Sequence, residues 1–128
     1  MRRLSPILTM FLLTITGCAA TGHRSSVVPE SQAQVGFASF YHSRFNGART
    51  ASGERYDEKA LMAAHRTLPF GTRVQVTNLG NGRSVVVTIV DRGPFAKGRI
   101  IDVSRRAARK LDFVRDGTAR VRLEILEN

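Results

Sequence analysis

The sequence has no tryptophan, a single cysteine and few aromatic residues. One cysteine cannot form an intramolecular disulfide. The chain also lacks an apolar run of the roughly 20 residues that a membrane-spanning helix needs. A shorter, mostly apolar run, residues 6–15, follows Arg2 and Arg3 near the start of the chain. A short apolar stretch after a basic start is typical of a signal peptide, so the sequence predicts an exported protein.

The end of this predicted signal peptide resembles a bacterial lipobox. Ile15, Thr16 and Gly17 place a branched aliphatic and two small residues before Cys18. In a lipobox the cysteine sulfur receives a diacylglyceryl group and the preceding peptide is removed, which would explain a lone thiol in an oxidising compartment. Ala19 rather than Asp after the cysteine favours, by the same resemblance, the periplasmic face of the outer membrane. The alternative is an ordinary secretory signal in which Cys18 is incidental.

The charge balance is strongly basic, with 20 Lys and Arg residues against 10 Asp and Glu residues and a formal net charge of +10. Such a charge could suit nucleic acid, anionic lipid or an acidic wall polymer. The export signal excludes most nucleic-acid roles, and no motif interleaves the arginines with aromatic residues. The positive charge is therefore either a dispersed soluble surface or an attraction for an acidic polymer.

The pattern divides the chain into a signal peptide over residues 1–17, a lipidated cysteine with a flexible tether over 18–34, and one domain over 35–126. Strands are expected at 35–41, 73–78, 84–90 and 119–125, with the almost wholly apolar 84–90 segment buried on both faces. Asn and Gly at 80–82 predict a hairpin. One helix is expected over 104–111, capped by Ser104. Short strands with Gly-rich connections indicate a mainly β fold, a small closed barrel.

Several kinds of chemistry have no motif in this sequence. Its histidines are isolated and lack the spacing of metal ligands, so neither a metal site nor a cofactor is expected. No Gly-x-Ser-x-Gly elbow and no glycine-rich phosphate loop occur. What remains is a set of polar residues at strand ends and loops.

Each of these polar residues has a functional and a structural interpretation. Glu54 is either a reactive carboxylate or a solvated loop residue. His65 is either part of a site or a histidine at the edge of the core that the backbone satisfies. Asp91 ends the 84–90 strand and could instead close an Asx-turn over the Gly-Pro that follows. Asp102 could simply bond the amides at the start of the helix.

Six motifs in order resemble the rare lipoprotein A (RlpA) family: GFASFY, FNGARTASGERYD, AAHRTLPFGT, VQVTNLGNG, DRGPF and GRIIDVS. The motifs lie between Gly36 and Ser104, and the resemblance as a whole covers Gly36 to about Val121. The resemblance implies a six-stranded double-psi β-barrel with one or two short helices. It also implies a peptidoglycan lytic transglycosylase that favours glycan strands stripped of their peptides. The family's important positions fall on Asp91, Glu54 and His65 as catalytic residues, and we expect the substrate to be bound by Asp102, Tyr41, Thr50 and Arg92.

The chemistry of a lytic transglycosylase requires few residues. The C6 hydroxyl of N-acetylmuramic acid attacks its own C1, so a single residue can protonate the leaving oxygen and then accept the hydroxyl proton. Asp91 is the candidate for this acid and base, and Arg92 is expected to point to substrate or solvent. The alternatives are a non-catalytic, expansin-like glycan-binding module, and a structural partner of cell-division or wall-synthesis proteins.

Overall fold

The computed structural model describes residues 33–126 of the chain. The predicted signal peptide, the lipidated Cys18 and most of the predicted tether lie outside the described residues. Within 33–126, none of the helices has the length and apolar character required to cross a membrane.

Six strands and two short helices make up the domain. The strands are β1 (Ala33–Phe40), β2 (Met62–Ala64), β3 (Arg73–Asn78), β4 (Ser84–Asp91), β5 (Arg99–Val103) and β6 (Ala119–Ile125). The helices are the 3-10 turn η2 (Ser43–Phe45) and α1 (Arg105–Lys110). The first strand begins at Ala33, so the predicted tether, which ended at 34, overlaps its first two residues.

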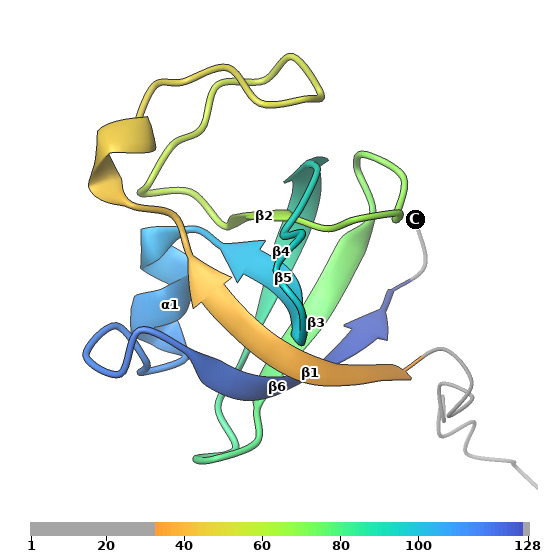
Figure 1. Ribbon diagram of the computed structural model, residues 1–128, viewed down its shortest axis with the longest axis vertical. Helices are drawn as coiled ribbons and strands as arrows, with labels where there is room; N and C mark the ends of the chain where they lie inside the picture. Colours follow the sequence, from red (N-terminus) through yellow and green to blue (C-terminus); the bar gives the residue numbers. More distant parts are fainter. Residues whose placement is uncertain (1–32, 127–128) are drawn as a thin grey trace, which may run out of the picture.

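The strands close into a barrel in the order β1-β5-β2-β4-β3-β6. β1 pairs with β5 in parallel and β2 pairs with β4 in parallel, while the other four pairings are antiparallel. In Figure 1 the long connection from β1 to β2 (yellow to green) arches above the barrel, and the β3–β4 hairpin lies at the opposite end. The expected six-stranded barrel with one or two short helices is confirmed.

The core fills the barrel and continues under α1. Alternate residues of the strands point inward and are almost fully buried, including Val74, Val76, Val87, Val121 and Leu123. Ser104 caps α1 as predicted, because its side chain accepts a hydrogen bond from the amide of Ala107. Burial of the apolar face of the helix against the barrel supplies the stability that so short a helix lacks by itself.

The prediction that β4 is buried on both faces was wrong. Val85, Val87 and Ile89 are buried, whereas Val86 and Thr88 on the other face are only half-buried. A strand of a closed barrel has an inner face filled by side chains and an outer face covered only by whatever packs on it. The run of β-branched residues therefore reflects strand propensity as well as burial.

A register shift lies between Ala63 and Ala64, where β2 pairs with β4. Ala63 is opposite Ile89 and Ala64 is opposite Asp91, so Val90 is an extra residue on β4. Strict alternation from Ile89 would turn the side chain of Asp91 into the barrel. The extra residue instead brings Asp91 onto the outer face, beside Ala64.

Candidate active site

The Asp91 carboxylate receives hydrogen bonds from three parts of the chain. The Tyr41 hydroxyl donates to Oδ2 over 2.5 Å, and the amides of Ala51 and Arg92 each donate to Oδ1 over 2.9 Å. The contact with the following amide differs from the predicted Asx-turn, which would use the amide of Gly93. Asp91 thus fixes the end of β4 against the long connection between β1 and β2.

Tyr41 is held in place by a second tyrosine. Its ring stacks on Tyr56 with centroids 4.5 Å apart, and the Tyr56 oxygen accepts a hydrogen bond from the amide of Arg105 over 3.2 Å. Burial raises the pKa of Tyr41 well above its ordinary value, and the hydrogen bond and charge of Asp91 and the charge of Asp102 add to this effect. Tyr41 therefore stays protonated and acts as a donor to Asp91.

The loop that carries Glu54 is anchored next to Asp91. The Thr50 hydroxyl, almost buried, donates to the Glu54 carbonyl over 2.6 Å, and the amide of Ser52 donates to the Val90 carbonyl over 3.0 Å. The loop therefore follows the end of β4, which places the amide of Ala51 on Asp91. Glu54 is exposed, and within residues 33–126 no hydrogen bond joins its carboxylate to Asp91.

Asp102 lies one strand away from Asp91. Ala64 in β2 is opposite Asp91 on one side and opposite Asp102 on the other. Residues opposite one another across strands share a face, and two strand spacings separate these two by about 10 Å. The carboxylate of Asp102 pairs with Arg99 over 2.5 Å and not with the helix amides, so the predicted helix-start role was wrong.

Arg92 is directed to the loop after β2. Its guanidinium donates to the carbonyls of His65, over 3.3 Å, and Leu68, over 2.8 Å, and lies 4.1 Å from the centre of the Phe70 ring. We expected this side chain to point to substrate or solvent, and the structure gives it two protein partners instead. Arg92 holds the loop 65–70 against the end of β4.

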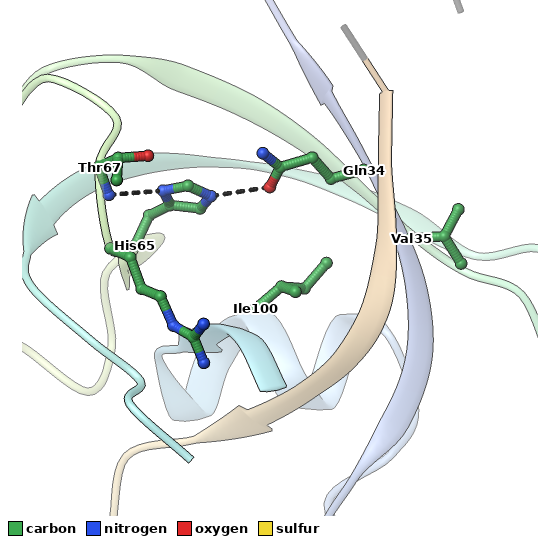
Figure 2. Close-up of a pocket in the computed structure, with 6 residues that line it drawn as sticks. Gln34, Val35, His65, Thr67 and Ile100 are labelled. Atoms are coloured by element: carbon green, nitrogen blue, oxygen red, sulfur yellow. Dashed lines mark hydrogen bonds between the residues drawn. The ribbon is translucent and has the colours of Figure 1, made fainter. Parts of the chain in front are cut away.

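The His65 ring is buried and satisfied on both nitrogens. Its Nδ1 accepts hydrogen bonds from the amides of Thr67 and Leu68 over 3.2 and 3.1 Å, and its Nε2 lies 3.0 Å from Oε1 of Gln34. Nδ1 accepts, so the proton of the neutral ring is on Nε2. Figure 2 shows the ring between the Thr67 amide and the Gln34 side chain.

A pocket of about 340 Å³ opens beside this ring, lined by Gln34, Val35, His65, Arg66, Thr67 and Ile100. Asp91 is not among the residues that line it, although the backbone amide of His65 donates to the Asp91 carbonyl over 3.1 Å. The structure thus brings Tyr41, Ala51 and Asp91 together and places the His65 ring in a different environment. The alternative interpretation of His65, as a core-edge residue satisfied by backbone, agrees with these contacts.

We expect the stability of the fold to fall at acid pH because of His65. Burial, followed by the positive charges of Arg92 and Arg66, lowers the pKa of His65. The folded state therefore favours the neutral ring, and stability is lost as the pH falls through the unfolded value of about 6.5 towards the folded one. Urea unfolding of the full chain should give a smaller free energy at pH 5.5 than at pH 7.5.

The same urea unfolding at the two pH values is then repeated on two variants. His65→Gln should reduce the difference between the two pH values, because the group that takes up the proton on unfolding is gone. His42→Gln is the matched control, because it replaces an exposed histidine at the start of η2. An equal pH difference in the unaltered chain and in His65→Gln would contradict this account.

Sequence reasoning missed three residues that organise this region. Gln34, which had been assigned to the tether, bonds to His65. Tyr56 supports Tyr41, and Arg66 donates to the carbonyls of Pro94, Ala96 and Arg99. The quoted motifs contain Tyr56 and Arg66 but not Gln34, and nothing in the local pattern indicates partners that lie 15 to 33 residues away. Among residues 33–126, no three His, Cys, Asp or Glu side chains are grouped as metal ligands.

These features define a structural class of protein, namely a small β-barrel with two parallel strand pairs and with acidic side chains on its outer face. A family model described as "Lytic transglycolase" matches residues 33–123. The chain belongs to this family, that of the RlpA proteins, and the fold is the double-psi β-barrel.

Curated relatives from the same family have high sequence identity to this chain. The endolytic peptidoglycan transglycosylase RlpA of Pasteurella multocida (strain Pm70) is 55% identical over 95 residues, which is 74% of this chain and 32% of the relative. The RlpA protein of Neisseria meningitidis serogroup A, of the same description, is 57% identical over 91 residues, 71% of this chain and 38% of the relative. The chain spans about a third of the length of these relatives.

Solved structures share the fold at lower identity. Streptomyces papain inhibitor superposes with a TM-score of 0.61 at 24% identity, covering 78% of this chain and 99% of that one. The apo expansin of Clavibacter michiganensis gives a TM-score of 0.59 at 20% identity, covering 75% of this chain and 51% of the expansin. At these identities the similarity establishes the barrel alone.

Proposed function

We propose that the protein is a lytic transglycosylase of peptidoglycan. It would cleave the β-1,4 bond between N-acetylmuramic acid and N-acetylglucosamine in peptide-poor glycan strands and leave 1,6-anhydro-muramic ends. The observation that carries the proposal is the Asp91 carboxylate, half-buried on the outer face of a barrel of the lytic transglycolase family and held by three donors. Relatives more than 50% identical are named endolytic peptidoglycan transglycosylases.

The proposed reaction uses Asp91 first as acid and then as base. Protonated Asp91 gives its proton to the glycosidic oxygen as the bond to C1 of the muramic acid breaks. The C6 hydroxyl of the same sugar attacks C1, and its proton passes to the Asp91 carboxylate. The attack is intramolecular and gains from proximity. The proposed reaction consumes neither water nor a cofactor.

The contacts around Asp91 suit its anionic stage. The Tyr41 hydroxyl and the two amides all donate, so they stabilise the carboxylate that forms when the proton leaves. Thr50 fixes the loop that provides the Ala51 amide. Glu54, exposed on that loop, and Asp102, across β2, are the two further carboxylates that could steady the positive charge of an oxocarbenium-like transition state.

His65 fits a positioning role within this proposal better than a catalytic one. Its Nδ1 accepts from two amides of the turn that follows it and so shapes that turn. The carbonyls of residues 65 and 68 then accept hydrogen bonds from the Arg92 guanidinium, next to Asp91. The ring would therefore act through Arg92, without touching the sugar.

A second candidate function is glycan binding without cleavage. It is favoured by the same three donors. A carboxylate whose sole role was to tie loops together would have the same three protein partners. Both functions place peptidoglycan glycan strands on the outer face of the barrel.

The experiment that separates the two candidates analyses products by mass. Purified sacculi, and glycan strands freed of peptide by an amidase, are incubated with the protein. Anhydro-muramic ends support the transglycosylase. Binding without new ends supports the binding module, and reducing muramic ends would identify a hydrolase instead.

We also propose that the protein is a lipoprotein anchored at the periplasmic face of the outer membrane, where proteins of cell division or wall synthesis are possible partners. The lipobox at Cys18 supports this proposal. Several acyl chains give stable anchoring, whereas one is marginal. In a Gram-negative host, the mature chain should begin at Cys18 with the added acyl mass and should separate with the outer membrane on a density gradient.

Two substitutions test the anchor. Cys18→Ser should abolish the acyl mass, because serine offers no sulfur for the diacylglyceryl group. Ala19→Asp should leave the acyl mass intact and shift the protein to the inner membrane. A mature chain that carries an unmodified Cys18 would overturn the anchor without affecting the proposed reaction.

A further inference from the structure

The most exposed large apolar side chain in the described chain is Phe95, which is 79% exposed. It follows Asp91 by four residues, in the loop between β4 and β5. An apolar ring in water gains nothing for the fold, since it buries almost no area. Aromatic side chains are enriched at surfaces that bind partners and ligands.

The backbone on both sides of Phe95 is held by a single guanidinium. Arg66 donates to the carbonyl of Pro94 over 2.5 Å and to that of Ala96 over 2.8 Å. The same side chain also donates to the carbonyl of Arg99 over 2.9 Å. These three bonds hold the backbone on either side of Phe95 against the residue that follows His65. A ring presented on a rigid backbone binds a ligand at a smaller entropic cost.

The residues before Phe95 orient it. Gly93 and Pro94 are buried, and Gly93 has φ +113°, a conformation that residues with a side chain rarely adopt. A Cβ at Gly93 would lie 3.7 Å from the nearest carbon of the Phe95 ring, so the ring lies over this glycine. Gly93 is separated from Asp91 by one residue. The ring is thus presented close to the end of β4 that carries the carboxylate.

The two other exposed phenylalanines near Asp91 differ from Phe95. One face of Phe70 is occupied by the Arg92 guanidinium at 4.1 Å, and one face of Phe45 by that of Arg44 at 4.8 Å. Within residues 33–126, no guanidinium and no other aromatic ring stacks on Phe95. Phe95 therefore has a ring face that is open to a stacking partner.

We propose that Phe95 is a stacking platform for one pyranose ring of the glycan, and that it positions the strand so that a glycosidic bond reaches Asp91. The inference rests on the proposed function, because it takes the glycan as the ligand. The axial C–H groups of a β-1,4-linked hexosamine form a flat apolar face that fits an aromatic ring, while its hydroxyl and amide groups remain in water. Phe95 is a binding residue in this account and takes no part in proton transfer.

The test measures binding apart from cleavage. Dissociation constants for peptide-free glycan strands are determined with the full chain carrying Asp91→Asn, so that the strands are not consumed. Adding Phe95→Ala should weaken binding about tenfold, whereas Phe95→Tyr and Phe95→Trp should keep it. Phe95→Leu should bind as weakly as Phe95→Ala, because it retains apolar area but lacks a flat ring.

Leu79→Ala is the matched control. Leu79 is 45% exposed and lies in the β3–β4 hairpin, at the end of the barrel opposite the long β1–β2 connection in Figure 1. Its removal should change neither binding nor cleavage. In chains with Asp91 intact, Phe95→Ala should raise KM for the strands and leave kcat within about twofold. Its melting temperature should equal that of the unaltered chain, since the side chain contributes little to the core.

Two results would overturn the inference while the proposed function stands. One is unchanged binding and KM in Phe95→Ala. The other is full binding by Phe95→Leu, which would mean an unspecific apolar contact. If the unaltered chain neither binds nor cleaves the strands, the proposed function fails and Phe95 loses its ligand with it.

Discussion

Asp91→Asn should lower the rate at which anhydro-muramic ends appear by roughly 10²-fold to 10⁴-fold, the range that a positioned proton donor and acceptor contributes. The substitution keeps the shape of the side chain and removes its ability to exchange a proton. Its Oδ1 can still accept from the amides of Ala51 and Arg92, so the loops around it should stay in place. The measurement is the initial rate on peptide-free strands, followed by mass.

The control for Asp91→Asn is Asp116→Asn, an exposed aspartate between α1 and β6. It changes the net charge by the same amount and should cleave at the unaltered rate. Co-sedimentation with sacculi should show that Asp91→Asn still binds. An Asp91→Asn protein that cleaves at full rate would leave glycan binding as the function of the site.

Tyr41→Phe has the second largest expected effect, a fall in kcat of about 10-fold to 100-fold. The substitution removes one oxygen, the donor to Asp91 Oδ2. A hydrogen bond to a charged group contributes roughly 1.5–3 kcal/mol, and about 1.4 kcal/mol corresponds to a factor of ten in rate. Because the bond stabilises the carboxylate formed after proton donation, KM should be almost unchanged.

Tyr56→Phe provides the comparison, since the chain has two tyrosines and they stack on one another. The Tyr56 oxygen accepts from the amide of Arg105 and does not reach Asp91. We expect Tyr56→Phe to unfold at a slightly lower urea concentration and to keep its kcat. Equal losses of kcat in the two variants would contradict a specific role for the Tyr41 hydroxyl, since Tyr56→Phe leaves its hydrogen bond to Asp91 in place.

Local patterns in the sequence predicted the elements whose residues alternate. The strands at 73–78 and 119–125 and the helix capped by Ser104 are where the side-chain period and the cap indicate them. β2 and β5 were not predicted as strands. β2 has only three residues, and both β2 and β5 gain their strand conformation from neighbours that lie far away in the sequence.

The candidate site shows the same division between local and distant information. The resemblance of the motifs indicated Asp91, and its place at the end of a strand followed from the apolar run before it. That Tyr41 donates to it could not be deduced, because 50 residues separate the two and only barrel closure brings them together. The contacts of Arg92 and His65 depend on the path of the loop 65–70, which no periodicity describes.

The extra residue at Val90 means that side-chain periodicity and side-chain position disagree at the reactive carboxylate. Asp91 comes two residues after the inward-facing Ile89, so regular pairing of β2 with β4 would turn its carboxylate towards Val74, Val87 and their neighbours, where a lone charge has no partner. The irregular pairing at Val90 keeps the carboxylate outside the barrel. A search for barrels of this kind by strict alternation would therefore count Asp91 as a core position and reject the residue on which the proposed reaction depends.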